Sequence, residues 1–173
     1  TYVLPFGDNL TGAAAVLGRG WQINGLATVS DGYPVSVREQ SGDQDDRIGD
    51  DSDLRPDLIP GGHTNNTGNP DAWVDVSQFT PTRLGYFGNL GRNTVTGPGL
   101  VNVDLSFFKN TDLSENTSVQ FRVETFNIFN RNNFATPDGM YAFRDGKVNP
   151  NFARITRTRT PARQIQLGLR FTF

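Results

Sequence analysis

The sequence predicts an all-β fold of antiparallel strands, and three observations support this prediction. Several runs alternate apolar and polar residues with a period of two, which puts the apolar side chains on one face of a strand. The composition favours turns and strands, with 19 glycines, 10 prolines and 13 phenylalanines among 173 residues. The last alternating run ends on the final residue, Phe173.

The alternating runs define five expected strands. The third and fourth strands are separated only by the tight turn "SENT" at 114–117, so they are expected to form a hairpin. One short helical turn is expected over 12–17, within a stretch of small residues. The expected strands are 1–6, 20–37, 100–112, 118–130 and 163–173.

Two long connections, 39–99 and 131–162, show no clear periodicity. A loop of this length is unusual inside a compact domain and indicates a surface excursion. The order of the connections is long, short, long. That order is typical of outer-membrane barrels, which have short periplasmic turns and long external loops, although sandwiches can have long loops too.

The polar positions of the strands form a second predicted feature. In a soluble β-sandwich they would face water, whereas in a membrane barrel they would face a wet lumen, and alternation alone does not separate the two. Depending on register, Asp104 is expected opposite or diagonal to Arg122 or Glu124, which would give a ladder of charges. Such a ladder could line a lumen or simply stabilise the sheet. The predicted lumen-facing residues are Asn102, Asp104, Arg122, Glu124, Gln164 and Arg170.

Two aromatic residues on the run 20–37 are spaced as a membrane girdle would require. Trp21 and Tyr33 are twelve residues apart on the same face, which is about 40 Å along one strand. A tilt of about 45° turns this into a height of roughly 28 Å, close to the ~25 Å apolar band of a barrel. Trp21 and Tyr33 are therefore the candidate girdle, and two unrelated core aromatics are the alternative.

The final strand, "RQIQLGLRFTF", is similar to the signal by which outer-membrane proteins are recognised for barrel assembly. The pattern combines a polar residue, a glycine two positions later, and hydrophobic residues at the last and third-last positions. A strand of this kind can add by edge pairing to an open sheet. We expect Phe173 to be the true end of the protein and Thr1 to lie inside a longer chain. The candidate signal residues are Gln166, Gly168, Phe171 and Phe173.

Four runs resemble the C-terminal barrel strands of TonB-dependent receptors, most closely the subgroup with an N-terminal carboxypeptidase-regulatory-like domain. They are "WQINGLATVSDGYPVSV", "FGNLGRNTVTGPGLVNVDLSFFKN", "VQFRVETFNIFNRNNF" and "RQIQLGLRFTF". The resemblance implies a gated outer-membrane transporter of about 22 strands with a plugged lumen. Five strands cannot close a barrel, because the smallest have about eight, so either this chain is a fragment or the missing strands come from elsewhere.

The resemblance also implies a location and partners. The location is the outer membrane of a Gram-negative cell, and the role is energy-coupled uptake of a large substrate. The expected partners are outer-membrane lipid, the barrel-assembly machinery, the TonB system through N-terminal parts missing from this chain, and the unidentified substrate.

The alternative is a secreted or periplasmic β-sandwich that binds glycans, with Trp21, Trp73 or Tyr86 as stacking platforms. An enzyme is not expected, because no set of nucleophile and base is visible, and no cofactor is expected. The net charge of -2 gives no electrostatic case for nucleic-acid binding. The absence of cysteine excludes disulfides and thiolate metal sites.

One acidic stretch is a weak Ca²⁺ candidate, because oxygen-rich loops can hold this ion. It lacks the spacing of an EF-hand loop, so a solvated loop is the favoured interpretation, and no other metal site is expected. His63, the only histidine, is expected to be an ordinary loop residue. The acidic residues are Asp43, Asp45, Asp46, Asp50, Asp51 and Asp53.

Overall fold

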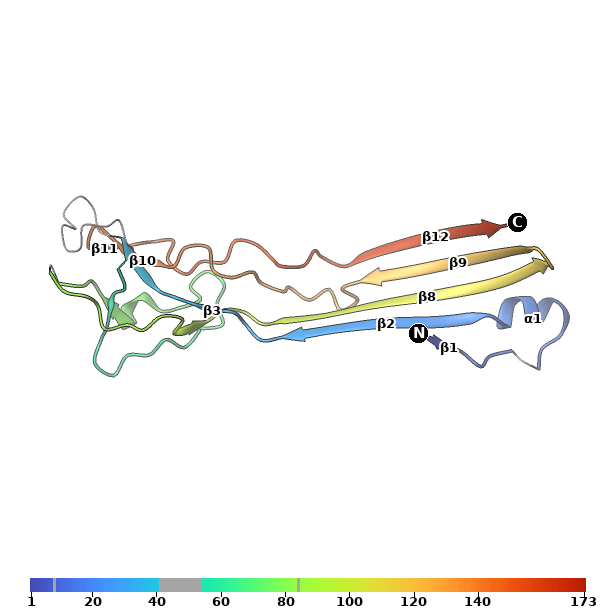
Figure 1. The fold of residues 1–173 in the computed structure, drawn as a ribbon, viewed down its shortest axis with the longest axis horizontal. Helices are drawn as coiled ribbons and strands as arrows, with labels where there is room; N and C mark the ends of the chain where they lie inside the picture. Colours follow the sequence, from blue (N-terminus) through green and yellow to red (C-terminus); the bar gives the residue numbers. More distant parts are fainter. Residues whose placement is uncertain (8, 41–53, 84) are drawn as a thin grey trace. The chain divides into compact units, whose positions relative to one another are not determined.

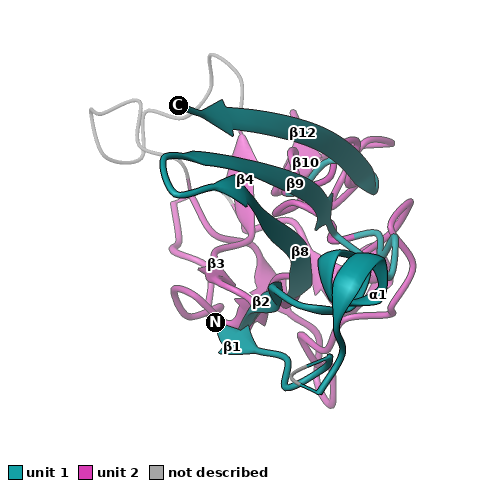
Figure 2. Ribbon diagram, turned by 90° about the vertical axis from the view of Figure 1, so that its right-hand side faces the viewer, with its two compact units in different colours: residues 1–29, 101–132, 160–173 teal, residues 30–100, 133–159 magenta. Residues whose placement is uncertain are grey.

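The computed structural model describes residues 1–7, 9–40, 54–83 and 85–173, and these fall into two compact units (Figure 2). Unit 1 comprises Thr1–Val29, Val101–Asn132 and Thr160–Phe173. Unit 2 comprises Ser30–Leu100 and Asn133–Arg159. Strands dominate both units, so the all-β prediction is confirmed.

Unit 1 is built on a five-stranded sheet with the order β1-β2-β8-β9-β12 (Figure 1). Successive long strands run in opposite directions, as the arrows of β2, β8, β9 and β12 show. The helix α1, Gly12–Gly18, lies between β1 and β2 in the chain and matches the expected helical turn. None of the helices in the described residues has the length and hydropathy needed to span a membrane. The strands are β1 Tyr2–Val3, β2 Trp21–Ser30, β8 Leu100–Ser114, β9 Thr117–Phe126 and β12 Gln164–Thr172.

The predicted hairpin is present as β8 and β9. Their antiparallel register runs from Leu105 opposite Thr125 to Ser114 opposite Thr117, so the turn is shorter than expected. β12 then pairs antiparallel with β9 over its whole length. β9 ends at Phe126, four residues before the predicted end, because Asn127 has a positive φ of 50° that leaves the extended conformation.

Unit 2 contains short strands in three small sheets. A three-stranded sheet has the order β11-β10-β4, and two-stranded sheets pair β3 with β7 and β5 with β6. A short 3-10 helix, η1, precedes β6. The elements are β3 Pro34–Val35, β4 Arg38–Gln40, β5 Asp57–Leu58, η1 Val76–Gln78, β6 Phe79–Thr80, β7 Val95–Thr96, β10 Tyr141–Arg144 and β11 Lys147–Val148.

The described parts of 39–99 and 131–162 are largely irregular, as expected, but they are more than surface excursions, because they carry short strands and pack together. Residues from both segments share one hydrophobic core, in which the Phe79 and Phe152 rings meet edge to face at 6.0 Å. The backbone N–H of Trp73 also donates to the Ala153 carbonyl at 3.0 Å. The buried core residues are Val37, Trp73, Val74, Phe79, Leu90, Val95, Ala142, Phe143, Phe152, Ala153 and Ile155.

The expected strand 20–37 is also too long, because β2 ends at Ser30. The chain then passes close to the "TGPG" segment, where a Cβ added at Gly32 would lie only 1.7 Å from the Gly97 carbonyl oxygen. A Cβ on Gly99 would lie 3.0 Å from the Ser30 carbonyl oxygen. Glycine at these positions lets two backbone segments touch, and the strand pattern breaks there.

Candidate functional site

The apolar face of the unit 1 sheet is formed in register by three strands. Phe107, Val123 and Leu167 occupy one row, since Phe107 pairs with Val123 and Val123 pairs with Leu167. On β12 this face stays open, with Leu167 67% and Phe171 60% exposed. An apolar face of this kind requires a non-aqueous covering, because burying each such side chain is worth about 1.5–3 kcal/mol.

Lys109 interrupts the apolar face near the β8–β9 turn. It pairs with Phe121, and its Nζ donates to the Thr111 hydroxyl at 3.0 Å and to the Asn110 carbonyl at 3.2 Å. Its aliphatic stem can cover apolar surface while the charged end bonds to polar groups. Lys109 is thus accommodated without breaking the apolar row.

The polar face carries the alternate residues of the same strands. Arg122 pairs with Phe108 on one side and with Gly168 on the other, and Gln120 pairs with Arg170. All six residues that were predicted to face a lumen occupy the same alternate positions of the strands as Arg122, so they belong to the polar face. That they line a lumen stays a prediction. They are Asn102, Asp104, Arg122, Glu124, Gln164 and Arg170.

A row of hydrogen bonds runs along this polar face. Gln120 Nε2 donates to Asn110 Oδ1 at 2.7 Å, and Arg122 Nε donates to Gln120 Oε1 at 2.6 Å. The Arg122 guanidinium also lies over the Phe108 ring, 5.6 Å from its centroid. Arg122 is therefore held by an amide and an aromatic ring. The sequence pattern did not indicate that Phe108 contacts a charged residue of the polar face.

The expected ladder of charges is only partly formed. Asp104 is the residue next to Leu105, which pairs with Thr125. Asp104 is therefore diagonal to Glu124 and not opposite Arg122. Its Oδ1 accepts hydrogen bonds from Asn102 Nδ2 at 2.9 Å and from the backbone N–H of Asn127 at 2.8 Å. The two carboxylates therefore give this part of the polar face a negative character.

Asn127 and Asn130 join the end of β9 to the segment that leads into β12. Both have a φ of 50°, a conformation that asparagine tolerates better than most residues. Buried Asn127 donates from Nδ2 to the carbonyls of Arg131 and Pro161, each at 3.0 Å, and its Oδ1 accepts from the Arg131 N–H at 3.0 Å. Asn130 Oδ1 accepts from the Arg163 N–H at 2.9 Å.

These two asparagines form an asparagine clamp, and sequence reasoning gave them no role. The run "FNIFNR" was significant only as part of a family resemblance. The available signal was the repeated Phe-Asn pair, since asparagine is a frequent choice where the chain must turn through a left-handed conformation. The clamp explains physically why asparagine stands at both positions.

The C-terminal strand carries the four candidate signal residues. Gln166 and Gly168 lie on the polar parity, Phe171 lies on the apolar face, and Phe173 follows β12 with its side chain fully exposed. A Cβ on Gly168 would meet Arg122 Cβ at 3.7 Å, which is an ordinary contact. Packing within the sheet therefore does not require glycine at 168. The outer edge of β12 has no strand partner among the described residues.

The aromatic girdle and the stacking platforms change in the structure. Trp21 begins β2 and its Nε1 donates to the Leu17 carbonyl at 2.9 Å. Tyr33 lies beyond the end of β2, under the Arg159 guanidinium at 5.1 Å, so the spacing along a single strand does not apply. Trp73 is buried and donates from Nε1 to the Thr96 carbonyl, so it cannot be a stacking platform, whereas Tyr86 is exposed.

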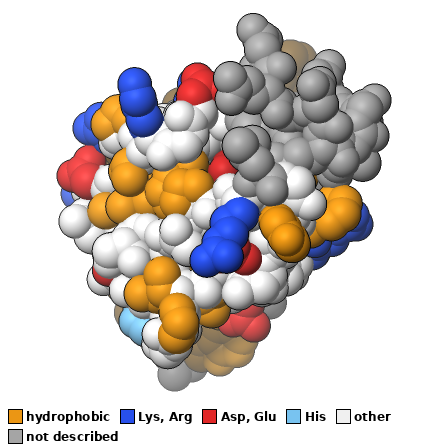
Figure 3. Space-filling view, turned by 90° about the vertical axis from the view of Figure 1, so that its left-hand side faces the viewer, with side chains coloured by type: hydrophobic (Ala, Val, Ile, Leu, Met, Phe, Trp, Pro, Cys, Tyr) orange, Lys and Arg blue, Asp and Glu red, His pale blue; other side chains and the backbone are white. Residues whose placement is uncertain are grey.

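Unit 2 contains an open groove of about 660 Å³, with His63 on its wall. Leu58, Ile59 and Leu90 supply apolar surface, and Asn65 adds an amide. On the face shown in Figure 3, hydrophobic, basic and acidic side chains are interspersed, so no single sign of charge dominates it. The described residues contain no group of three potential metal ligands, and the acidic calcium candidates at 43–53 lie outside the described residues.

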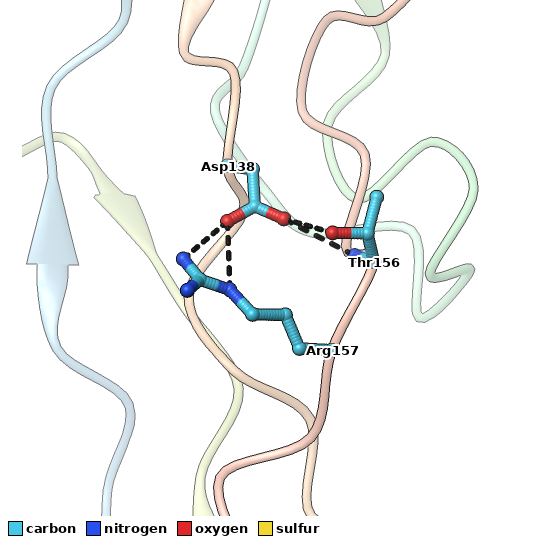
Figure 4. A network of polar contacts seen from close by, with 3 residues as sticks. All are labelled: Asp138, Thr156 and Arg157. Carbon is cyan, nitrogen blue, oxygen red and sulfur yellow. Dashed lines mark hydrogen bonds and ion pairs between the residues drawn. The ribbon is translucent and has the colours of Figure 1, made fainter.

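A polar network fixes part of unit 2 (Figure 4). Asp138 accepts hydrogen bonds from the Thr156 hydroxyl and from the Arg157 guanidinium, whose nearer nitrogen is at 2.6 Å. The Thr156 hydroxyl first, and the Arg157 guanidinium second, hold the pKa of the Asp138 carboxyl below its ordinary value of 3.8. The carboxylate therefore stays charged at neutral pH and joins the beginning and the end of the segment 133–159.

Comparison with known families decides what kind of sheet this is. The model of a family described as an outer membrane beta barrel domain matches residues 1–166. The chain belongs to this family. Neither curated proteins nor solved structures gave a match.

Membership of the barrel family confirms the predicted location, the outer membrane. It also decides between the two interpretations of the alternating strands. The apolar face of the unit 1 sheet belongs to a membrane barrel, and the secreted or periplasmic sandwich is no longer supported.

Proposed function

We propose that this chain forms part of the wall of a TonB-dependent outer-membrane transporter that takes up a large substrate by energy coupling. The observation that carries the proposal is the asparagine clamp. It lies in the run "VQFRVETFNIFNRNNF", which resembles the C-terminal strands of TonB-dependent receptors, and it gives that run a defined structural role.

In this proposal the two faces of the sheet have different environments. The apolar face with Phe107, Val123 and Leu167 contacts lipid, and the polar face with Arg122 lines the lumen. The open edges at β1 and β12 pair with further strands, since five strands cannot close a barrel. A barrel wide enough to hold a plug has room for a large substrate.

Unit 2 then supplies the first contact with the substrate from outside. Its groove of about 660 Å³ has the size of a small-molecule site and combines apolar and polar walls. Tyr86 and Phe87 expose adjacent aromatic rings on the same unit. Mixed walls and exposed rings suit an uncharged or weakly charged ligand, of which the groove would hold one part.

The proposal is tested with the full-length protein in its own cells. We expect heat-modifiable mobility on gels after outer-membrane fractionation, and site-directed crosslinks between the periplasmic N-terminal segment and TonB. A strain without TonB is the control, in which the protein should reach the membrane but lose the crosslink and the uptake. A protein that sits normally in the outer membrane, forms no crosslink and functions equally without TonB would refute energy coupling while leaving the barrel intact.

A further inference from the structure

A cavity of about 240 Å³ opens on the polar face of the unit 1 sheet. It is bounded by β8, by the end of β9 and by the segment that leads into β12. A water molecule occupies about 30 Å³ of liquid, so the cavity has room for a small organic group as well as for several waters. Its walls include Asn102, Asp104, Phe126, Asn127, Pro161 and Gln164.

The cavity wall contains a hydrogen-bond acceptor that nothing satisfies. Asn102 Oδ1 is buried and has no hydrogen-bond partner, while Nδ2 of the same amide is engaged by Asp104 Oδ1 at 2.9 Å. Because Oδ1 is closed to solvent, an occupant of the cavity does not reach it, and Asn102 acts on the cavity by holding the Asp104 carboxylate through Nδ2.

The second acceptor of the cavity carries a charge. Asp104 Oδ1 receives two neutral donors, Asn102 Nδ2 and the Asn127 N–H, and within the described part of the chain no cationic side chain pairs with this carboxylate. Glu124 lies diagonally across the sheet and adds a second negative charge. Arg122 is two residues further along β9 and engaged with Gln120 and Phe108.

The remaining walls fit a flat or compact organic cation. The Phe126 ring and Pro161 give apolar surface, and an aromatic ring attracts a cation placed over its face. Guanidinium and primary ammonium groups carry several donors and no acceptor, which matches an acceptor-rich wall. Within the described residues no three His, Cys, Asp or Glu side chains cluster, so a transition-metal ion would lack its usual ligands here.

We propose that this cavity binds a guanidinium or primary ammonium group of a small organic cation. Asp104 supplies the charge and accepts the N–H donors, and Asn102 positions this carboxylate through Nδ2. The inference needs only the polar face of the sheet, and its test does not depend on TonB coupling.

The test uses the full-length protein in detergent, with methylguanidinium as the probe. Binding is measured by NMR saturation transfer and by titration calorimetry. We expect saturable binding that is at least about tenfold weaker in Asp104→Asn, because bonds to a charged acceptor are the stronger ones. Asn102→Leu should also weaken binding. Asp112→Asn is the matched control, because it removes one carboxylate from β8 away from the cavity and should bind normally.

Tetramethylammonium, which has the charge but no N–H donor, should fail to compete with methylguanidinium. Heat-modifiable gel mobility of each variant shows that its barrel is folded. Saturable binding that is equally strong in Asp104→Asn and Asp112→Asn, or equal competition by tetramethylammonium, would overturn the proposal. The absence of saturable binding in the unmodified protein would also overturn it and would leave a cavity filled by water.

Discussion

Replacement of Asn127 by alanine tests the asparagine clamp most directly. The change removes three hydrogen bonds, to the Arg131 carbonyl, the Pro161 carbonyl and the Arg131 N–H, from a residue that is only 3% exposed. At about 1 kcal/mol for each bond, this loss costs roughly 3 kcal/mol. Alanine at a φ of 50° adds about 1–2 kcal/mol of backbone strain. The expected loss of stability is therefore about 4–5 kcal/mol.

Two further variants separate the contributions to that loss. Asn127→Gly keeps the left-handed backbone without strain and should lose only the hydrogen-bond part, about 3 kcal/mol. Asn130→Ala has the same φ of 50° but loses only the bond to the Arg163 N–H, so about 2–3 kcal/mol is expected. Stability is measured by urea unfolding of the full-length protein in detergent. If neither Asn127→Ala nor Asn130→Ala were less stable than the unmodified protein, the clamp would not have the importance we assign to it.

The other predictions concern the end of the chain, a close contact of the backbone and a polar network. Deletion of Phe173 should lower the amount of protein in the outer membrane through the assembly signal and not through stability, because its exposed ring contributes no packing within the described structure. Gly168→Ala should likewise reduce assembly without loss of unfolding stability. Normal membrane levels of both variants would refute the assembly signal. Gly32→Ala should destabilise strongly in the same urea assay, since its Cβ would overlap the Gly97 carbonyl oxygen, and a near-neutral effect would contradict that contact. The Asp138 network should hold above pH 3.8 and weaken as pH falls through the lowered pKa of the folded carboxyl, because a depressed pKa stabilises only while the group is charged. Protection of the segment around Asp138 from hydrogen exchange, taken relative to the intrinsic exchange rate at each pH, should therefore fall only in acid, and Asp138→Asn should abolish that pH dependence.

The sequence predicted the long strands because their patterns are local. A period of two across β8 and β9, separated by a tight turn, specifies a hairpin and its faces without knowledge of the rest of the chain. The parity of Asp104, Arg122 and Glu124 followed from the same pattern. Their partners did not, because the diagonal position of Asp104 depends on the register of β8 and β9, which shifts between Asp112 and Ser114.

Unit 2 was missed because its order comes from contacts between residues far apart in the sequence. Strands of two to four residues, such as β5, β7 and β10, are too short to show a period. Trp73 was a candidate stacking platform, yet its indole ring is buried in the shared core. Only the three-dimensional structure brings Phe79 beside Phe152.

The clamp was missed for a different reason. Asn127 and Asn130 look like ordinary loop residues, and their role depends on the Pro161 carbonyl and the Arg163 N–H, more than thirty residues away. No local pattern predicts such partners. Phe108 was similarly hidden, since an aromatic residue at a polar position gives no indication that an arginine lies over it.

The shared core of unit 2 makes its two chain segments interdependent during evolution. Residues 30–100 contribute Phe79 and residues 133–159 contribute Phe152, so neither segment contains a complete interior of its own. One segment cannot be exchanged alone for that of another barrel protein, because the exchange would leave half of the core without its complement. New surface properties of unit 2 arise by substitutions on its surface, or by exchanging both segments together. The two segments of unit 2 are inherited as a pair.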